Sequence, residues 1–158
     1  MWGPVPDSPA GGNFIAGDGD PFYATPIWQS VGGLTIGQHY TISFYQGAAQ
    51  QHGLSGATTE RWQVTFGGAT QLSTLINNPS HGVQPWSLQT LDFIATSGTQ
   101  VLNFLAVGTP SGYPPISLLD GVSVTAVAGG APEPAAWMIM LAGFGLFGLA
   151  ARRRRAKA

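Results

Sequence analysis

The fold class is decided by the stretch YTISF at residues 40–44, in which apolar and polar residues alternate without a break. A period of two places every second side chain on one face, as in a β-strand that buries one side. The same pattern recurs in RWQVTF at residues 61–66 and in VSVTA at residues 122–126. This alternation is typical of one face of a β-sheet and not of an amphipathic helix. We therefore expect an all-β body with no helix before residue 135.

Further strands are predicted around these three segments, with short turn sequences between them. The additional strand segments are residues 13–16, 27–31, 71–75, 87–95 and 101–107. Turn sequences rich in Gly, Asn, Ser and Pro fall at residues 32–33, 67–68, 77–79, 97–98 and 112–115. Eight short strands with turns at this spacing predict an antiparallel β-sandwich of the jelly-roll type.

The composition of the chain excludes several classes of function. Residues 1–134 contain one basic residue, Arg61, against seven acidic residues, a net charge of −6. A body this acidic cannot neutralise a phosphate backbone, which excludes nucleic-acid binding. The chain has no cysteine, and this removes disulfides, thiol catalysis and thiolate metal sites.

The C-terminal sequence combines an uncharged apolar segment with a basic cluster. Residues 135–151 are 17 uncharged residues, and four arginines follow at residues 152–155. As a helix this segment would extend about 26 Å, close to the roughly 30 Å of a bilayer's hydrocarbon core. It has no polar face, so a surface helix of a soluble domain is the less favoured alternative. Because clustered arginines stay in the cytoplasm, residues 1–131 are predicted to lie on the external side.

The same residues resemble the PEP-CTERM sorting signal of Gram-negative bacteria. The matching parts are a Pro-Glu-Pro motif, an aromatic residue, a Gly-rich apolar stretch and terminal arginines: Pro132, Glu133, Pro134, Trp137, Gly143, Phe144, Gly145, Arg152, Arg153, Arg154 and Arg155. The resemblance implies that a membrane enzyme, an exosortase, processes the chain near the Pro-Glu-Pro motif. It also implies a non-enzymatic mature body at the cell surface or outside the cell, often among exopolysaccharide. The alternative is a single-span protein that stays anchored in the membrane.

The body resembles the galactose-binding-like sandwiches that often precede this signal. The matching sequences are GGNF at residues 11–14, GLTIGQHYTI at 33–42 and LLDGVSV at 118–124. Such folds usually have a strand before the first of these segments, so the resemblance implies a missing opening strand and one unpaired sheet edge. The first residues also lack the positive start and apolar stretch of an export signal. We therefore expect the chain to begin inside the natural protein.

Five parts are predicted along the chain, and together they define an all-β fold followed by one transmembrane helix. They are an irregular N-terminal segment at residues 1–10, a β-sandwich domain at 11–128, a linker with the Pro-Glu-Pro motif at 129–134, a transmembrane helix at 135–151 and a basic cytoplasmic tail at 152–158.

The acidic residues of the body indicate a calcium site more than catalysis. Asp18 and Asp20 lie in a Gly-Asp loop, and such loops usually cap backbone amides. Glycoside hydrolysis requires two carboxylates that face each other, and we predict no catalytic residue. Related sandwiches often hold one structural calcium between an early loop and the closing strand, which implies Asp120 as a ligand with Asp18 or Asp20. The favoured alternative is that Asp120 fixes the turn into the last strand.

Other titratable residues are predicted to be structural. Glu60 is expected to form a surface ion pair with Arg61. His39, His52 and His81 share no metal-binding spacing and are expected to be solvated or packed.

Carbohydrate binding is the main functional alternative on the same scaffold. The candidate aromatic residues are Trp86, Trp28 and Tyr113, and the polar loops at residues 48–52 and 77–81 could supply hydroxyl and amide groups. Most aromatic residues in alternating strands are nevertheless expected to belong to the core.

Overall fold

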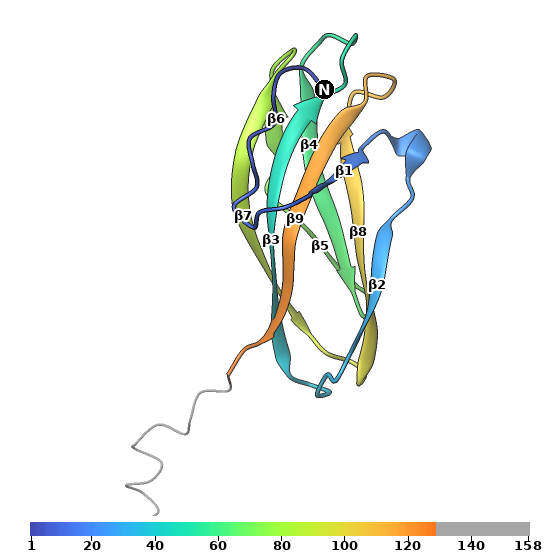
Figure 1. Cartoon of the computed structure of the whole chain (residues 1–158). Coiled ribbons are helices and arrows are strands. Elements are labelled where there is room, and N and C mark those ends of the chain that lie inside the picture. Colours follow the sequence, from blue (N-terminus) through green and yellow to red (C-terminus); the bar gives the residue numbers. More distant parts are fainter. Residues whose placement is uncertain (129–158) are drawn as a thin grey trace, which may run out of the picture. The chain divides into compact units, whose positions relative to one another are not determined.

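Residues 1–128 are described by the computed structural model, and nearly all of their regular structure is β-strand (Figure 1). The elements are β1 (Ile15–Asp18), the 3-10 helix η1 (Pro21–Tyr23), β2 (Ile27–Gly32), β3 (His39–Gln50), β4 (Thr58–Phe66), β5 (Ala69–Leu72), β6 (Ile76–Asn78), β7 (Val83–Ile94), β8 (Thr99–Thr109) and β9 (Pro115–Ala126). The predicted linker, transmembrane helix and basic tail at residues 129–158 lie outside the described residues. In residues 1–128 no helix is long and apolar enough to span a membrane.

The strands form two antiparallel sheets that face each other. The first sheet has the order β1-β9-β3-β7, and the second has the order β2-β8-β4-β5, with β6 also paired to β4. Most consecutive strands therefore lie in opposite sheets, which is the connectivity of a jelly roll. This confirms the predicted all-β antiparallel sandwich. The sequence analysis missed β6 because its three residues follow β5 without alternation.

The core forms where the alternating stretches bring their apolar residues between the sheets. Ile42 and Phe44 of β3 face Trp62, Val64 and Phe66 of β4, and all five are buried. Burial of each large side chain contributes about 1.5–3 kcal/mol relative to exposure. The Trp62 indole also donates a hydrogen bond of 3.0 Å to the carbonyl of Leu118 in the opposite sheet. The predicted strand faces are thus confirmed by their burial.

Strand β9 begins earlier than the sequence indicated. Asp120 and Gly121 look like a turn that introduces the last strand, but β9 already begins at Pro115 and includes both. Opposite them the pairing register of β3 shifts between Ser43 and Tyr45, and Gly121 has a φ of 60°. The prediction that Asp120 fixes a turn into the strand is therefore wrong, because this Asp-Gly pair forms a β-bulge inside it.

The two ends of the sandwich carry different loops. We call one end the loop end; it contains the β3–β4, β6–β7 and β8–β9 connections at residues 51–57, 79–82 and 110–114. At the opposite end β9 stops, and the Val127 amide donates a hydrogen bond of 2.9 Å to the carbonyl of His39. The chain therefore leaves the sandwich at the end away from these loops (Figure 1).

Residues 1–14 form an irregular segment, the N-terminal arm, that crosses the outer face of the first sheet before β1 (Figure 1). The Trp86 indole of β7 donates a hydrogen bond of 2.9 Å to the carbonyl of Pro6. The ring of Phe14 packs edge-on against Trp86, with ring centroids 5.3 Å apart. The Trp86 side chain therefore anchors the arm.

Candidate functional site

The most prominent surface feature of the loop end is a group of exposed rings, which we call the aromatic turn. It consists of Phe22 and Tyr23 of η1 and Tyr113 of the β8–β9 loop, with exposed fractions of 83%, 66% and 46%. A recess of about 320 Å³ lies beside η1, lined by Gly19, Pro21, Ala24 and residues 105–108 of β8. Several large apolar side chains exposed at one place indicate a binding surface more often than single exposed apolar residues do.

The carboxylate of Asp20 holds the aromatic turn in place. Its side chain is only 3% exposed and accepts hydrogen bonds from the amide of Phe22 at 3.0 Å and from the hydroxyl of Ser111 at 3.1 Å. The amide of Gly112 donates to its second oxygen. The Gly112 amide, then the Phe22 amide, lower the pKa of Asp20 below its usual value. One ionised group thus joins η1 to a loop about ninety residues away in sequence.

The Gly-Asp loop before η1 has the geometry of a cap. Gly19 donates its amide to the Pro115 carbonyl at 2.8 Å and accepts from the Gly108 amide at 2.9 Å. A Cβ atom at position 19 would lie 2.9 Å from the Gly108 nitrogen, so only glycine fits there. Asp18 accepts the Asp20 amide at 2.9 Å. The prediction that these carboxylates cap backbone amides is confirmed.

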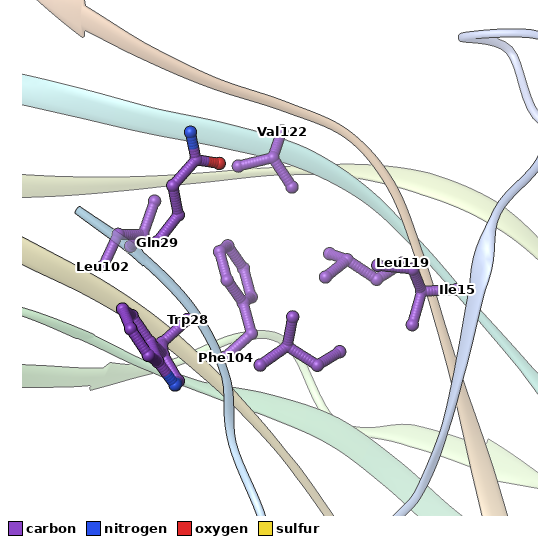
Figure 2. A pocket seen from close by; sticks show the side chains of 8 residues that line it. Ile15, Trp28, Gln29, Leu102, Phe104, Leu119 and Val122 are labelled. Atoms are coloured by element: carbon purple, nitrogen blue, oxygen red, sulfur yellow. The ribbon is translucent and has the colours of Figure 1, made fainter. Parts of the chain in front are cut away.

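A second pocket lies at the open edge of the sandwich, between β1 and β9 on one side and β2 and β8 on the other (Figure 2). Its volume is about 150 Å³, and its lining is Ile15, Ile27, Trp28, Gln29, Leu102, Phe104, Leu119 and Val122. The pocket exists because β1 pairs only with residues 116–119 of β9, which leaves the rest of that edge open. Gln29 is the one polar side chain of the lining, so the pocket suits apolar groups better than a sugar.

The predicted carbohydrate residues lie in three separate places. Trp28, with 67% of its surface exposed, lines the open-edge pocket, whereas Tyr113 belongs to the aromatic turn. Trp86 packs under the N-terminal arm on the outer face of the first sheet. Through Asp20, the structure instead joins the loop that carries Tyr113 to the turn that carries the exposed residues Phe22 and Tyr23. Tyr23 is among the aromatic residues that the sequence makes available for sugar binding, whereas Phe22 was missed, although an aromatic pair in a turn outside any alternating strand is a signal of exposure.

The predicted calcium ligands do not converge. Asp18 pairs with Ile116 across β1 and β9, whereas Asp120 lies four residues further along β9, about 13 Å away at the usual strand rise. The carboxylate of Asp120 accepts the Gly121 amide at 2.8 Å, and its second oxygen has no partner among the described residues. In residues 1–128 no three acidic or histidine side chains are arranged to hold a metal ion. Calcium binding stays a prediction.

Glu60 corrects another expectation, because it forms no surface ion pair with Arg61. Its side chain is fully buried between the sheets, in phase with Trp62 and Val64 on β4, while Arg61 points outward. The hydroxyl of Thr58 donates to one carboxylate oxygen, and the other has no partner among the described residues. Burial raises the pKa of Glu60 to about 7. The strict alternation of β4 could have revealed this inward position.

The histidines of the loop end pack against the N-terminal arm. The Trp2 ring is flanked by His52 of the β3–β4 loop and His81 of the β6–β7 loop, at centroid distances of 4.4 and 4.1 Å. We call the space that Trp2 occupies the histidine slot. Both histidines are exposed to solvent and contact the Trp2 ring, which agrees with the expectation that they are solvated or packed.

Comparison with known proteins identifies the C-terminal signal. Residues 131–155 match the family described as the PEP-CTERM protein-sorting motif, as predicted. This signal indicates exosortase-dependent export to the cell envelope or surface. The match covers about a sixth of the chain and does not extend to the sandwich. No curated protein sequence matches the chain.

Solved structures resemble the sandwich in fold. One is the EclA C-terminal domain, described as a sugar-binding protein, with a TM-score of 0.51 and 18% identity over 79% of this chain and 89% of that one. Another is CBM35 from Cellvibrio japonicus Abf62, with a TM-score of 0.39 and 16% identity over 79% and 87% of the two chains. At these identities the first comparison shows the fold alone.

Proposed function

We propose that this chain, which carries a PEP-CTERM sorting motif, is an exported, non-enzymatic surface or matrix protein whose sandwich binds carbohydrate through the aromatic turn. The observation that carries the proposal is the exposure of Phe22, Tyr23 and Tyr113 on backbone fixed by Asp20. Aromatic faces attract the C–H groups of a sugar ring, and fixed rings lose little freedom when a ligand binds.

The surroundings of the aromatic turn support a sugar ligand. The adjoining recess of about 320 Å³ falls in the size range of small-molecule sites, and its apolar lining suits the C–H face of a sugar ring and not its hydroxyls. Ser111 and Asp18 belong to the two segments that carry the rings, and their side chains can hydrogen-bond to sugar hydroxyls. The sandwich of the EclA domain, a sugar-binding protein, supports the proposal as a precedent for the fold.

The sorting motif supplies the cellular context of the proposal. Residues 135–151 insert in the membrane, an exosortase processes the chain near residues 132–134, and the sandwich reaches the surface of a Gram-negative cell among exopolysaccharide. The last strand of the sandwich ends at Ala126, at the end opposite the loop end. Intact mass measured on the protein from its native host tests this: a chain that ends near residue 134 supports processing, and a chain that still ends at Ala158 favours permanent anchoring.

A role without catalysis is supported by the use that the structure makes of its carboxylates. Asp20 accepts donors from Phe22, Ser111 and Gly112, and the amide of Asp20 occupies one oxygen of Asp18. Carboxylates engaged in this way are poorly placed to act as the acid and base of glycoside hydrolysis. The asparagine variants of both residues should leave any hydrolysis of polysaccharide unchanged.

Binding of the full chain in mild detergent to neutral oligosaccharides, measured by calorimetry, tests the proposal. The double variant Phe22→Ala/Tyr23→Ala should bind at least about tenfold more weakly, because it removes two stacking rings. Ile36→Ala is the matched control, since Ile36 is also exposed but lies in the β2–β3 connection at the opposite end. Equal affinity of the double variant and the control would contradict the proposal.

A structural calcium ion at Asp120 is a second, separate part of the proposal. The support is the second carboxylate oxygen of Asp120, which lies at the β9 bulge and has no partner among residues 1–128. Calcium should raise the Tm of the full chain and leave that of Asp120→Asn unchanged, whereas equal responses would remove Asp120 as a ligand.

A further inference from the structure

The β3–β4 and β6–β7 loops are joined into one frame by the buried side chain of Gln50. Its carbonyl oxygen accepts the His81 amide at 2.6 Å, and its amide group donates to the Gly56 carbonyl at 2.8 Å. The Gly56 amide in turn donates to the hydroxyl of Ser80 at 2.9 Å. Gln50 thus bonds to both loops, and the Gly56–Ser80 hydrogen bond joins the loops to each other, which fixes the positions from which His52 and His81 project.

Trp2 enters this frame from the N-terminal arm. Its ring makes angles of 34° and 36° with the rings of His52 and His81. Its indole N–H donates to the Leu54 carbonyl at 2.7 Å, and its backbone amide donates to the Gln50 carbonyl at 3.0 Å. The histidine slot therefore offers two ring faces and two carbonyl acceptors, and Trp2 uses all four.

The arm that carries Trp2 is held to the sandwich by few directional contacts. It belongs to neither sheet, and its prolines at positions 4, 6 and 9 have no amide hydrogen to donate to a strand. The hydrogen bonds from the arm to the sandwich run through Trp2 and Pro6. An arm of this kind can leave its place without opening either sheet.

A polar recess adjoins the histidine slot. Its volume is about 320 Å³, and its lining is Ala57, Thr58, Thr59, Asn77, Asn78 and Pro79. Ala57 and Pro79 of this lining are the sequence neighbours of Gly56 and Ser80, whose hydrogen bond joins the two loops. The recess therefore lies next to the loop frame. Thr58 and Asn78 are buried and hydrogen-bonded to Glu60, Gly82 and Gln84. Thr59 and Asn77 are therefore the polar side chains of the lining that can bind the hydroxyls of a ligand.

We propose that the histidine slot is a second carbohydrate site, separate from the aromatic turn, and that Trp2 is a built-in plug that a pyranose ring of a polysaccharide displaces. The ring takes the place of the indole between His52 and His81, and two of its hydroxyls donate to the carbonyls of Leu54 and Gln50. The next sugar unit reaches the polar recess. This inference shares its ligand class with the proposed function but uses none of the residues of the aromatic turn.

Only molecules in which Trp2 has left the histidine slot can bind sugar there. The apparent affinity of the site is therefore its intrinsic affinity multiplied by the fraction of such molecules. If the arm is released about one tenth of the time, its removal should strengthen binding about tenfold. In the Phe22→Ala/Tyr23→Ala background, Trp2→Ala should therefore bind cello-, manno- or galacto-oligosaccharides about tenfold more tightly than the parent. Adding His81→Ala should abolish this gain, and a synthetic peptide of residues 1–8 should compete with the sugar.

A second measurement does not depend on the stability of Trp2→Ala. The full chain is labelled with 5-fluorotryptophan, and the ¹⁹F signal of Trp2 is assigned from Trp2→Phe. Saturating oligosaccharide should shift this signal toward the position of a solvated indole, and the signal of the fully buried Trp62 should stay fixed. Unchanged affinity in Trp2→Ala, or an unmoved Trp2 signal while the aromatic turn is saturated, would overturn the plug and leave the proposed function intact.

Discussion

The two halves of the interior between the sheets are built from different side chains. In the half near the end of β9, β3 and β4 bury Ile42, Phe44, Val64 and Phe66. In the half near the loop end, the same two strands bury polar side chains, which are Gln46, Gln50, Thr58 and Glu60. In the apolar half, the hydrophobic effect holds the two sheets together and imposes no particular geometry. In the polar half, hydrogen bonds need defined distances and angles, so they fix the positions of the loops. The apolar half therefore contributes mainly to the stability of the fold, and the polar half mainly positions the loops.

Replacement of Trp62 in the apolar half should give the largest effect. Trp62→Ala removes a fully buried ring and leaves the Leu118 carbonyl without its donor, so the free energy of unfolding should fall by about 3–5 kcal/mol. Urea unfolding of the full chain measures the loss. Leu88→Ala, at an exposed position of β7, is the control and should change the free energy by less than about 0.5 kcal/mol. Similar losses in both variants would contradict the placement of the core.

The second largest effect should come from the protonation of Glu60. Its pKa is about 7 in the folded chain against 4.5 when exposed, so the folded state holds the proton more tightly. The stabilisation is complete below pH 4.5 and is lost as the pH rises to about 7. The fold should therefore be more stable at pH 5 than at pH 8, by at most about 3 kcal/mol. Chemical denaturation across this range measures the difference.

Glu60→Gln separates this effect from other titrations. The amide cannot ionise, so the variant should lose most of the difference between pH 5 and pH 8 and should be the more stable protein at pH 8. A variant with the same pH profile as the unchanged chain would show that Glu60 is not the responsible group.

A smaller and more local effect is expected for Gln50. Gln50→Ala leaves the His81 amide and the Gly56 carbonyl without partners, at a cost of about 2 kcal/mol. Hydrogen exchange should accelerate in residues 51–57 and 79–82 and stay slow in residues 40–44. The exposed neighbour provides the control, since Gln51→Ala should leave both regions unchanged. Equal acceleration in all three regions would contradict a local role for Gln50.

Asp20→Asn should have the smallest effect on global stability and a clear effect on binding. Because its pKa is lowered, Asp20 stabilises the fold above its ordinary pKa of 3.8, and this contribution is lost as the pH falls below that value. The pH dependence is thus opposite to that of Glu60. The asparagine variant should bind carbohydrate several-fold more weakly with a nearly unchanged Tm. Full affinity in the variant would show that the aromatic turn does not depend on Asp20.

Much of the fold could be predicted from the sequence because a strand that buries one face has an apolar residue at every second position. In residues 40–44 and 61–66 the apolar positions are the buried ones, and both segments form the predicted strands. The same alternation places Glu60 inward on β4, although a charged side chain is normally expected at the surface. At Asp120 a short sequence typical of a turn proved to be a bulge, since the partner strand and not the local sequence decides between them.

The candidate site was harder to predict because its contacts join distant parts of the chain. Asp20 binds Gly112 across 92 positions, and Trp2 meets His52 and His81 only once the arm has crossed a sheet. The predicted polar loops at residues 48–52 and 77–81 are wrong in part, because residues 48–50 end β3 and residues 77–78 belong to β6. Nothing in either sequence indicates that Gln50 joins the two loops that follow these strands. The sorting motif, by contrast, is a linear signal and could be read directly.

The central claim, that the loop end is the carbohydrate-binding end, is tested most directly by mapping backbone amide shifts of the full chain during titration with oligosaccharide. The account predicts shifts in residues 19–24 and 110–114 and none in the connections at residues 33–38, 67–68 and 95–98. Shifts confined to those three connections, or spread evenly over the outer sheet faces, would contradict it.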